Sequence, residues 1–143
     1  MALPFHITCT FDAVPLFELD DSRFQMIKRG AVAPLMAGHR YLIVEYALAS
    51  YLESMDLHGI RIAPVSILDR STDTEHRSYK RIFVSQFFRA SEIHDLNLDG
   101  PRLLTLNDTY VFCSPDMRAV LEDGGFEYLR FSEGLTGFAA NAL

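Results

Sequence analysis

Apolar residues recur at a helical spacing in one segment near the middle of the chain. They are Val44, Ala47, Leu48, Tyr51, Leu52 and Met55, at positions i, i+3, i+4, i+7, i+8 and i+11. This spacing places the side chains on one face of an amphipathic helix. Gly59 follows, and glycine is common where a left-handed residue ends a helix. The pattern therefore predicts a helix over residues 43–57.

A second helix is predicted from its start signal. Ser114 can cap a helix, Pro115 suits the first helical position, and Asp116 places a negative charge in the first turn. Residues 124–125 are both glycine and provide the stop. The sequence therefore predicts a helix over residues 115–123.

Other apolar segments have the β-branched and aromatic composition of strands. They cover residues 5–11, 60–68, 79–88, 102–106, 109–113 and 126–131. Pro64 lacks an amide donor, so its strand is expected at a sheet edge or bulged there. Asn107-Asp108 suits a tight turn between two of the strands. Residues 12–22 are predicted to form a surface loop, and residues 23–42 short pieces and turns.

These elements define an α+β fold class. We expect a mixed, mainly antiparallel sheet packed by the two helices, with strand 79–88 near the centre of the sheet. No linker, low-complexity segment or change in composition divides the 143 residues, so residues 1–143 are expected to form one domain.

Charge and composition argue against several classes of partner and location. Nineteen acidic and thirteen basic residues give a net charge of −6, and the basic residues are dispersed, so a nucleic-acid partner is not expected. No apolar stretch approaches the roughly 20 residues that cross a bilayer. Met1–Phe5 lacks the basic start of a secretory signal. We therefore expect a cytoplasmic protein that does not contact the membrane.

Sequence motifs point to no enzyme class. The chain lacks GxSxG, GxxxxGK[ST], GxGxxG and HExxH patterns, and Cys9 and Cys113 have no CxxC partner. No metal or cofactor is therefore expected. His76 and His94 each lie close to an acidic residue that could orient the imidazole for catalysis. The simpler interpretation places both histidines in solvated loops.

Phenylalanines concentrate in the strand predicted over residues 79–88. Phe83, Phe87 and Phe88 are interpreted as core residues, because alternate positions of a strand fill an interior. The alternative is that they line a ligand pocket.

Acidic residues gather in the two polar segments that flank strand 79–88. They are Asp69, Asp73 and Glu75 before the strand, and Glu92, Asp95 and Asp99 after it. Solvated loops are the simpler interpretation, and an acidic patch that docks on a basic cleft is the alternative. The two segments are separated by a strand of roughly 30 Å, at about 3.3 Å per residue, so one partner surface is expected to use one of them. We prefer the second, because residues 90–101 contain no Lys or Arg.

The order of motifs along the chain carries a resemblance to a known family. Val44–Leu52 (VEYALASYL) is followed by His58–Val65 (HGIRIAPV) and then by the aromatic strand and acidic loop of Tyr79–Asp99. Tyr110–Glu122 and the ending Gly134–Phe138 (GLTGF) complete the series. This order resembles a family of bacterial immunity proteins, which guard their producer against polymorphic toxins delivered to neighbouring cells.

The resemblance covers about residues 40–138 and implies a function without assigning residues to it. It implies a cytoplasmic protein that binds and neutralises a cognate toxin by direct contact, without a cofactor. On this hypothesis the six acidic residues named above are the partner-binding residues, facing a basic cleft of the toxin. Two other hypotheses remain. One is a small-molecule-binding or enzymatic domain that uses an aromatic-lined pocket with His76 or His94, and the other is a subunit of a larger assembly.

Overall fold

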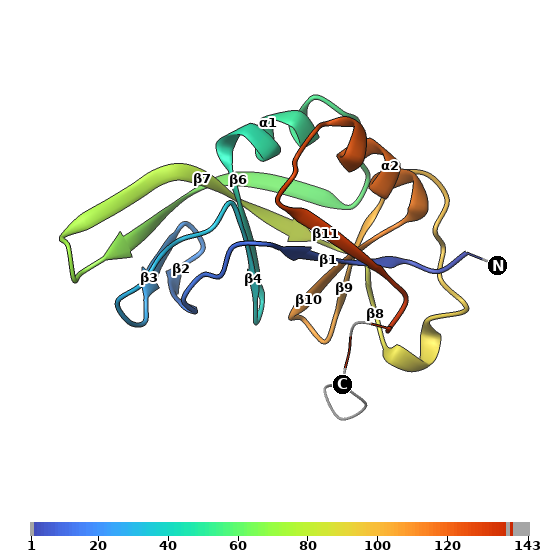
Figure 1. Ribbon diagram of the computed structural model, residues 1–143, viewed down its shortest axis with the longest axis horizontal. Coiled ribbons are helices and arrows are strands. Elements are labelled where there is room, and N and C mark those ends of the chain that lie inside the picture. Colours follow the sequence, from blue (N-terminus) through green and yellow to red (C-terminus); the bar gives the residue numbers. More distant parts are fainter. Residues whose placement is uncertain (1, 137, 139–143) are drawn as a thin grey trace.

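The computed structural model describes residues 2–136 and Phe138, and it combines strands with two α helices (Figure 1). Gly137, within the ending on which the resemblance partly depends, lies outside the described residues. The strands are β1 (Phe5–Cys9), β2 (Leu16–Asp20), β3 (Arg23–Met26), β4 (Leu35–Gly38), β5 (Tyr41–Glu45), β6 (Ile60–Asp69), β7 (Thr74–Val84), β8 (Phe87–Phe88), β9 (Leu103–Leu106), β10 (Tyr110–Cys113) and β11 (Leu129–Glu133). The helices are α1 (Tyr46–Glu53), α2 (Pro115–Asp123) and the 3-10 turn η1 (Ala90–Glu92).

The strands form two sheets. The six-stranded sheet has the order β2-β3-β6-β7-β5-β4, and the five-stranded sheet has the order β11-β1-β10-β9-β8. Neighbouring strands are antiparallel except in the pairs β3–β6 and β8–β9. The predicted α+β class with mainly antiparallel pairing is confirmed. The strand predicted over residues 79–88 is divided: residues 79–84 are the second half of β7, which does lie inside the six-stranded sheet, whereas residues 87–88 form β8 at the edge of the other sheet.

The six-stranded sheet curls around a core of its own. Phe24, Ile43 and Ile67 are fully buried on one of its faces. The curl brings the edge strand β2 close to β5, the second strand from the other edge, and the Tyr41 hydroxyl accepts a hydrogen bond from the Leu16 amide at 3.2 Å.

A second core joins both sheets to both helices. Leu48 and Leu52 of α1, Met117 and Leu121 of α2, and strand residues such as Ile82 are its buried members. The two helices lie on the same side of the molecule (Figure 1), and the Tyr51 hydroxyl donates a hydrogen bond to the Val120 carbonyl oxygen at 2.8 Å. Helix α2 confirms the prediction over residues 115–123, and the Ser114 hydroxyl caps it by accepting from the Met117 amide.

A third core covers the other face of the five-stranded sheet. Phe88, Leu104, Leu106 and Phe112 are buried there, and Ile93 packs over them from the segment that follows β8.

Helix α1 is shorter than the predicted helix 43–57. Residues 41–45 form β5, which pairs with β4 on one side and with β7 on the other. Leu48 and Leu52 are buried as the apolar spacing predicts, whereas Ala47 is exposed. Gly59 does adopt the left-handed conformation, with φ of +73°, but it does so in the turn before β6 and not at the helix end.

Strand β2 lies inside residues 12–22, where a surface loop is predicted, and β3 and β4 lie inside residues 23–42. β2 is an edge strand whose first residue, Leu16, is buried while the next four are exposed. It therefore lacks the alternating apolar pattern that reveals a half-buried strand in a sequence.

Pro64 lies at a point of β6 where no neighbouring strand needs a hydrogen bond from its missing amide. β6 lies inside the sheet, but β3 pairs only with its residues 66–68, so Pro64 has a strand partner on one side only. The register with β7 shifts between Val65 and Ile67, directly after the proline. The predicted bulge next to Pro64 is therefore present, and it lies in an interior strand and not at a sheet edge.

The β9–β10 hairpin is confirmed together with its turn. Asn107 and Asp108 have φ of 55° and 53°, the left-handed pair that tight hairpin turns require. β1 ends two residues before the end of the predicted strand 5–11. The prediction over residues 126–131 is wrong for its first half, because β11 begins only at Leu129 and residues 127–128 form a turn.

Candidate functional site

The first acidic segment forms the tip of the β6–β7 hairpin. The Asp69 carboxylate accepts hydrogen bonds from the Ser71 hydroxyl at 2.6 Å and from the Ser71 amide at 3.0 Å, and the hydroxyl bond in particular lowers the pKa of Asp69. Glu75 forms an ion pair with Arg77 at 2.6 Å, and this hydrogen bond lowers the pKa of Glu75. Asp73 is exposed in the turn. Asp69 therefore shapes the turn, and Asp73 is the carboxylate of this group that is free to meet a partner.

The second acidic segment lies at the opposite end of the molecule, around η1 (Figure 1). The Glu92 carboxylate accepts a hydrogen bond from the Arg89 amide at 2.8 Å and caps the turn. Asp95 and Asp99 are exposed, and their carboxylates make no hydrogen bond or ion pair with the described residues. Glu92 is thus structural, while Asp95 and Asp99 remain available.

Arg102 borders the second segment, although residues 90–101 contain no base. Its Nε donates to the Asp99 carbonyl oxygen at 2.6 Å, and its Nη1 donates to the Gln86 side chain at 3.2 Å. Gln86 in turn donates to the Asn97 carbonyl oxygen at 3.1 Å. The acidic segment is therefore held against β8 by a cation, which reduces its negative potential.

The candidate catalytic histidines lie apart from the cavities between the sheets. His76 is half-buried on β7, with its ring 6.5 Å from that of Tyr79, and His94 is exposed. Neither lines the two cavities, of about 260 and 540 Å³, that open between the sheets. Within residues 2–136 and Phe138, no three His, Cys, Asp or Glu side chains converge as a metal site would require.

The three phenylalanines of the predicted core strand have different environments. Phe88 is buried, whereas Phe87 is 75% exposed at the edge of the five-stranded sheet. Phe83 is half-buried between two guanidinium groups, with the Cζ atoms of Arg61 and Arg81 at 3.8 and 4.5 Å from its ring centroid. The prediction that all three fill the core is wrong for Phe87, because β8 is a two-residue edge strand and only one of its faces is covered.

Exposed apolar side chains gather at the N-terminal hairpin. Among the described residues six large hydrophobic side chains are exposed, and four of them, Phe11, Phe17, Leu19 and Ile27, lie within residues 11–27. Phe17 and Ile27 are each 60% exposed. Sequence reasoning missed this cluster, because exposure of an apolar side chain has no local signal in an edge hairpin.

Strand register places part of this cluster in one row across four strands. Phe17 on β2 is opposite Gln25 on β3, Gln25 is beside Leu68 on β6, and Leu68 is opposite Glu75 on β7. Ile27 is two positions beyond Gln25 and shares its side of the sheet. We call these five residues, Phe17, Gln25, Ile27, Leu68 and Glu75, the β2–β3 face.

Helix α1 leaves the β2–β3 face uncovered. Its Glu53 forms an ion pair with Lys80 at 2.8 Å, and its Leu48 and Leu52 pack in the same core as Ile82. The helix therefore covers the C-terminal half of β7, whereas the β2–β3 face lies beside the hairpin end of that strand (Figure 1).

No described helix is long and apolar enough to cross a membrane. Comparisons of the chain with protein-family models, with curated proteins and with solved structures give no match. The resemblance to immunity proteins is carried by the residues alone and stays a prediction.

Proposed function

We propose that this protein binds and neutralises a cognate toxin by direct contact, and that the β2–β3 face forms the centre of the contact. The observation that carries the proposal is the clustering of exposed apolar side chains. Phe17 and Ile27, each 60% exposed, lie on one uncovered side of the sheet. Clustered large apolar side chains with a polar rim are typical of protein-binding surfaces.

Charged side chains of both signs border this surface: Arg70 donates to Gln25 at 2.9 Å, and Lys28 and Arg29 follow Ile27, but several carboxylates in the neighbouring turns are unpaired. Asp12, Asp21 and Asp73 are exposed, and their carboxylates form no ion pair with the described residues. The whole chain carries a net charge of −6. Complementary charge speeds association and suppresses wrong partners. A toxin that acts on nucleic acids or nucleotides needs a basic cleft, and the net negative charge of this chain suits such a partner.

The test uses one substitution on the proposed surface and a matched one far from it. Phe17→Ala removes a 60% exposed aromatic from the β2–β3 face, and Phe87→Ala removes a 75% exposed aromatic from the opposite end. The partner to use is a toxin domain encoded immediately upstream of the gene. We expect Phe17→Ala to weaken binding by about 2 kcal/mol, which is roughly 30-fold, and to reduce protection of co-expressing cells. We expect Phe87→Ala to leave both measurements unchanged.

Stability measurements separate a contact role from a folding role. Both side chains are largely exposed, so each substitution should change the unfolding free energy by no more than about 0.5 kcal/mol. Unchanged affinity in Phe17→Ala and in Phe17→Asp contradicts the proposed surface. A failure of the parent protein to bind or protect against the neighbouring toxin contradicts the proposed function itself.

Charge reversal tests the acidic segment favoured by the sequence. Asp95→Lys and Asp99→Lys together leave Glu92 in place, because Glu92 caps the turn at Arg89. If that segment is the contact surface, the double variant associates more slowly and with less dependence on salt. If the β2–β3 face is the contact surface, the double variant binds like the parent protein.

A further inference from the structure

The six-stranded sheet has two edge strands, and only one of them is protected. β2 carries Glu18 and Asp20, and its register with β3 shifts between these two residues. Charged side chains and bulges are the usual means by which an edge strand avoids pairing with another chain. β4 has the sequence LMAG, with no charge and no proline, and it pairs with β5 in an unbroken register. The outer edge of β4 is therefore able to pair with a further strand.

The backbone groups that β4 leaves free can be identified from its pairing with β5. The Glu45 amide donates to the Pro34 carbonyl oxygen at 2.8 Å, so the backbone of residue 34 faces β5. Along an antiparallel pair, residues that face the partner strand alternate with residues whose N–H and C=O point away from it. Leu35 and Ala37 therefore direct both groups away from β5, where they form no hydrogen bond with the described residues.

β1 presents a second free edge beside β4. It pairs with β10 only through its first two residues. At its other end the Thr10 amide donates to the Tyr128 carbonyl oxygen at 2.9 Å, so the N–H and C=O of Cys9 point away from β11. Cys9 and the whole of β4 line the same cleft, which has a volume of about 540 Å³. Two strand edges with unpaired backbone groups thus border one cavity.

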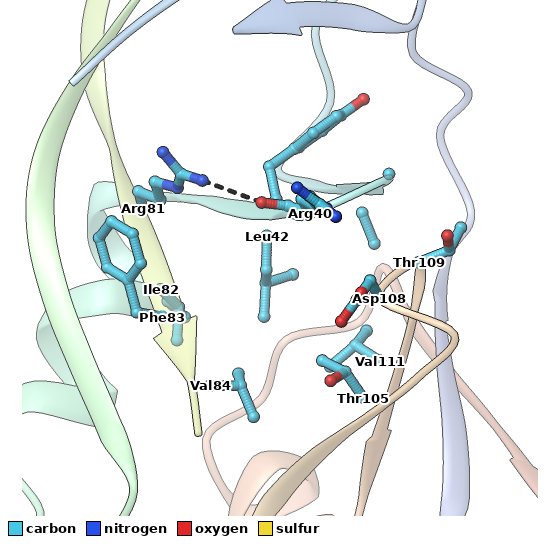
Figure 2. Close-up of a pocket in the computed structure, with 13 residues that line it drawn as sticks. Arg40, Leu42, Arg81, Ile82, Phe83, Val84, Thr105, Asp108, Thr109 and Val111 are labelled. Carbon is cyan, nitrogen blue, oxygen red and sulfur yellow. Dashed lines mark hydrogen bonds between the residues drawn. The ribbon is translucent and has the colours of Figure 1, made fainter. Parts of the chain in front are cut away.

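The turn between β4 and β5 is held from both sides. Figure 2 shows the Arg81 guanidinium bonded to the Arg40 carbonyl oxygen, at 2.9 Å, and the Arg40 amide donates to the Asp108 carbonyl oxygen at 2.6 Å. Glu18 compensates the charge of Arg81 at 2.7 Å, so this cation fixes the turn and does not select a ligand. An edge that is already fixed loses little conformational freedom when a partner pairs with it, which favours binding.

We propose that the cleft binds an extended, uncharged peptide segment of another protein, which pairs with the free edge of β4. An extended backbone offers donors and acceptors that alternate as those of Leu35 and Ala37 do. The 4 residues of β4 span about 13 Å at roughly 3.3 Å per residue, so a segment of about five residues covers the edge.

The lining of the cleft favours apolar side chains on this segment. Ile7, Val14 and Val111 belong to it, and Phe11, which is 60% exposed, lies in its wall. Among the described lining residues Asp12 is the single acid, and none is a lysine or arginine, so nothing there selects a charged segment. The cleft uses no residue of the β2–β3 face. The proposed toxin contact and this site can therefore fail independently.

The amide protons of the free edge report directly on the pairing. The probe is the uncharged peptide acetyl-TVTVT-amide, and its control is the same peptide with every backbone amide N-methylated. In two-dimensional ¹H–¹⁵N spectra of the labelled protein, we expect the probe to shift the Ala37 amide proton downfield in a saturable way, because that proton gains an acceptor. The Met36 amide, which faces β5, should move less. An Ala37 amide that does not respond to the probe, or that responds equally to both peptides, overturns the proposal.

Substitution of Ala37 gives an independent measurement. Ala37→Pro removes the free donor and places a ring at the edge, so it should weaken binding of the probe by roughly 10-fold or more. Ala37 is exposed and its amide has no partner in the fold, so an edge strand should tolerate this proline. Ala37→Ser keeps the amide and should bind like the parent protein. Equal binding by the two variants refutes the assignment.

Two further outcomes are distinguished by the same variants. If Ala37→Pro does not fold, the comparison of the probe with its N-methylated control decides the proposal. Sedimentation of the parent protein over a range of concentrations tests whether a second copy of the chain takes the edge. A dimer that Ala37→Pro abolishes and Ala37→Ser retains identifies that second copy as the occupant and overturns the assignment to another protein.

Discussion

The hydrogen bonds of Ser114, which fix the loop before β9, can be tested with a single substitution. The side chain is fully buried. Its hydroxyl donates to the Gly100 carbonyl oxygen at 2.6 Å, and it accepts from the Arg102 amide at 2.9 Å and from the Met117 amide at 3.3 Å. One hydroxyl therefore caps α2 and also anchors the end of the acidic segment. Ser114→Ala removes all three hydrogen bonds while keeping the backbone.

The expected loss is the sum of a cap and two internal hydrogen bonds. A lost N-cap costs about 1 kcal/mol, and each of the two remaining bonds contributes about 1 kcal/mol net. Ser114→Ala should therefore lower the unfolding free energy by about 3 kcal/mol. For a chain of this length the corresponding decrease in Tm is roughly 10 °C.

Urea unfolding followed by circular dichroism measures this loss, and Ser132→Ala is the control. Ser132 is half-buried on β11, and its hydroxyl makes no hydrogen bond with the described residues, so its removal should stay within about 0.5 kcal/mol. A Ser114→Ala loss below about 1 kcal/mol would refute the reasoning, because it could not include even a normal cap.

Three further predictions follow from burial. Leu48→Ala and Leu52→Ala should each lower the unfolding free energy by about 2–5 kcal/mol, and unchanged thermal stability would contradict the packing of α1. Burial lowers the pKa of His6, so near pH 6 the unfolded state binds more protons than the folded state. The free energy of unfolding, measured by urea titration, should therefore fall as pH decreases through about 6.5. The variant His6→Gln should remove this dependence. Burial raises the pKa of Cys113 to about 12, so iodoacetamide should label this thiol in the native protein only slowly near pH 8, as read by mass spectrometry. The free energy of unfolding should also fall as pH rises above about 8.5, because the thiol ionises first in the unfolded state.

The sequence predicted correctly those elements whose bounds are set by residues adjacent in the chain. Helix α2 begins at Pro115 because Ser114 caps it, and both residues are adjacent in sequence. The predicted helix 43–57 is too long because Val44 fits the helical spacing but belongs to β5. Its strand conformation depends on pairing with Leu35 on one side and with Lys80, 36 residues away, on the other, and the helical spacing around Val44 reports neither pairing.

The candidate sites depend even more on distant residues. The hydrogen-bond partners of Arg81 lie 41 to 63 positions away in the chain, so nothing near Arg81 in the sequence distinguishes it from a surface arginine. The acidic residues give a different lesson. Asp69 stands two residues before Ser71, a spacing typical of turns closed by an aspartate side chain, and this signal could have identified Asp69 as structural.

The position of β1 has a consequence for how the protein forms during synthesis. β1 lies between β10 and β11, so it pairs with two strands that are synthesised about 100 residues after it. The six-stranded sheet uses only residues 16–84 and can assemble while the rest of the chain is still being made. The five-stranded sheet waits for Glu133, because Phe5 pairs with that residue. Pairing over such sequence separation is slow, and until it happens the apolar residues of β1 stay exposed to other chains.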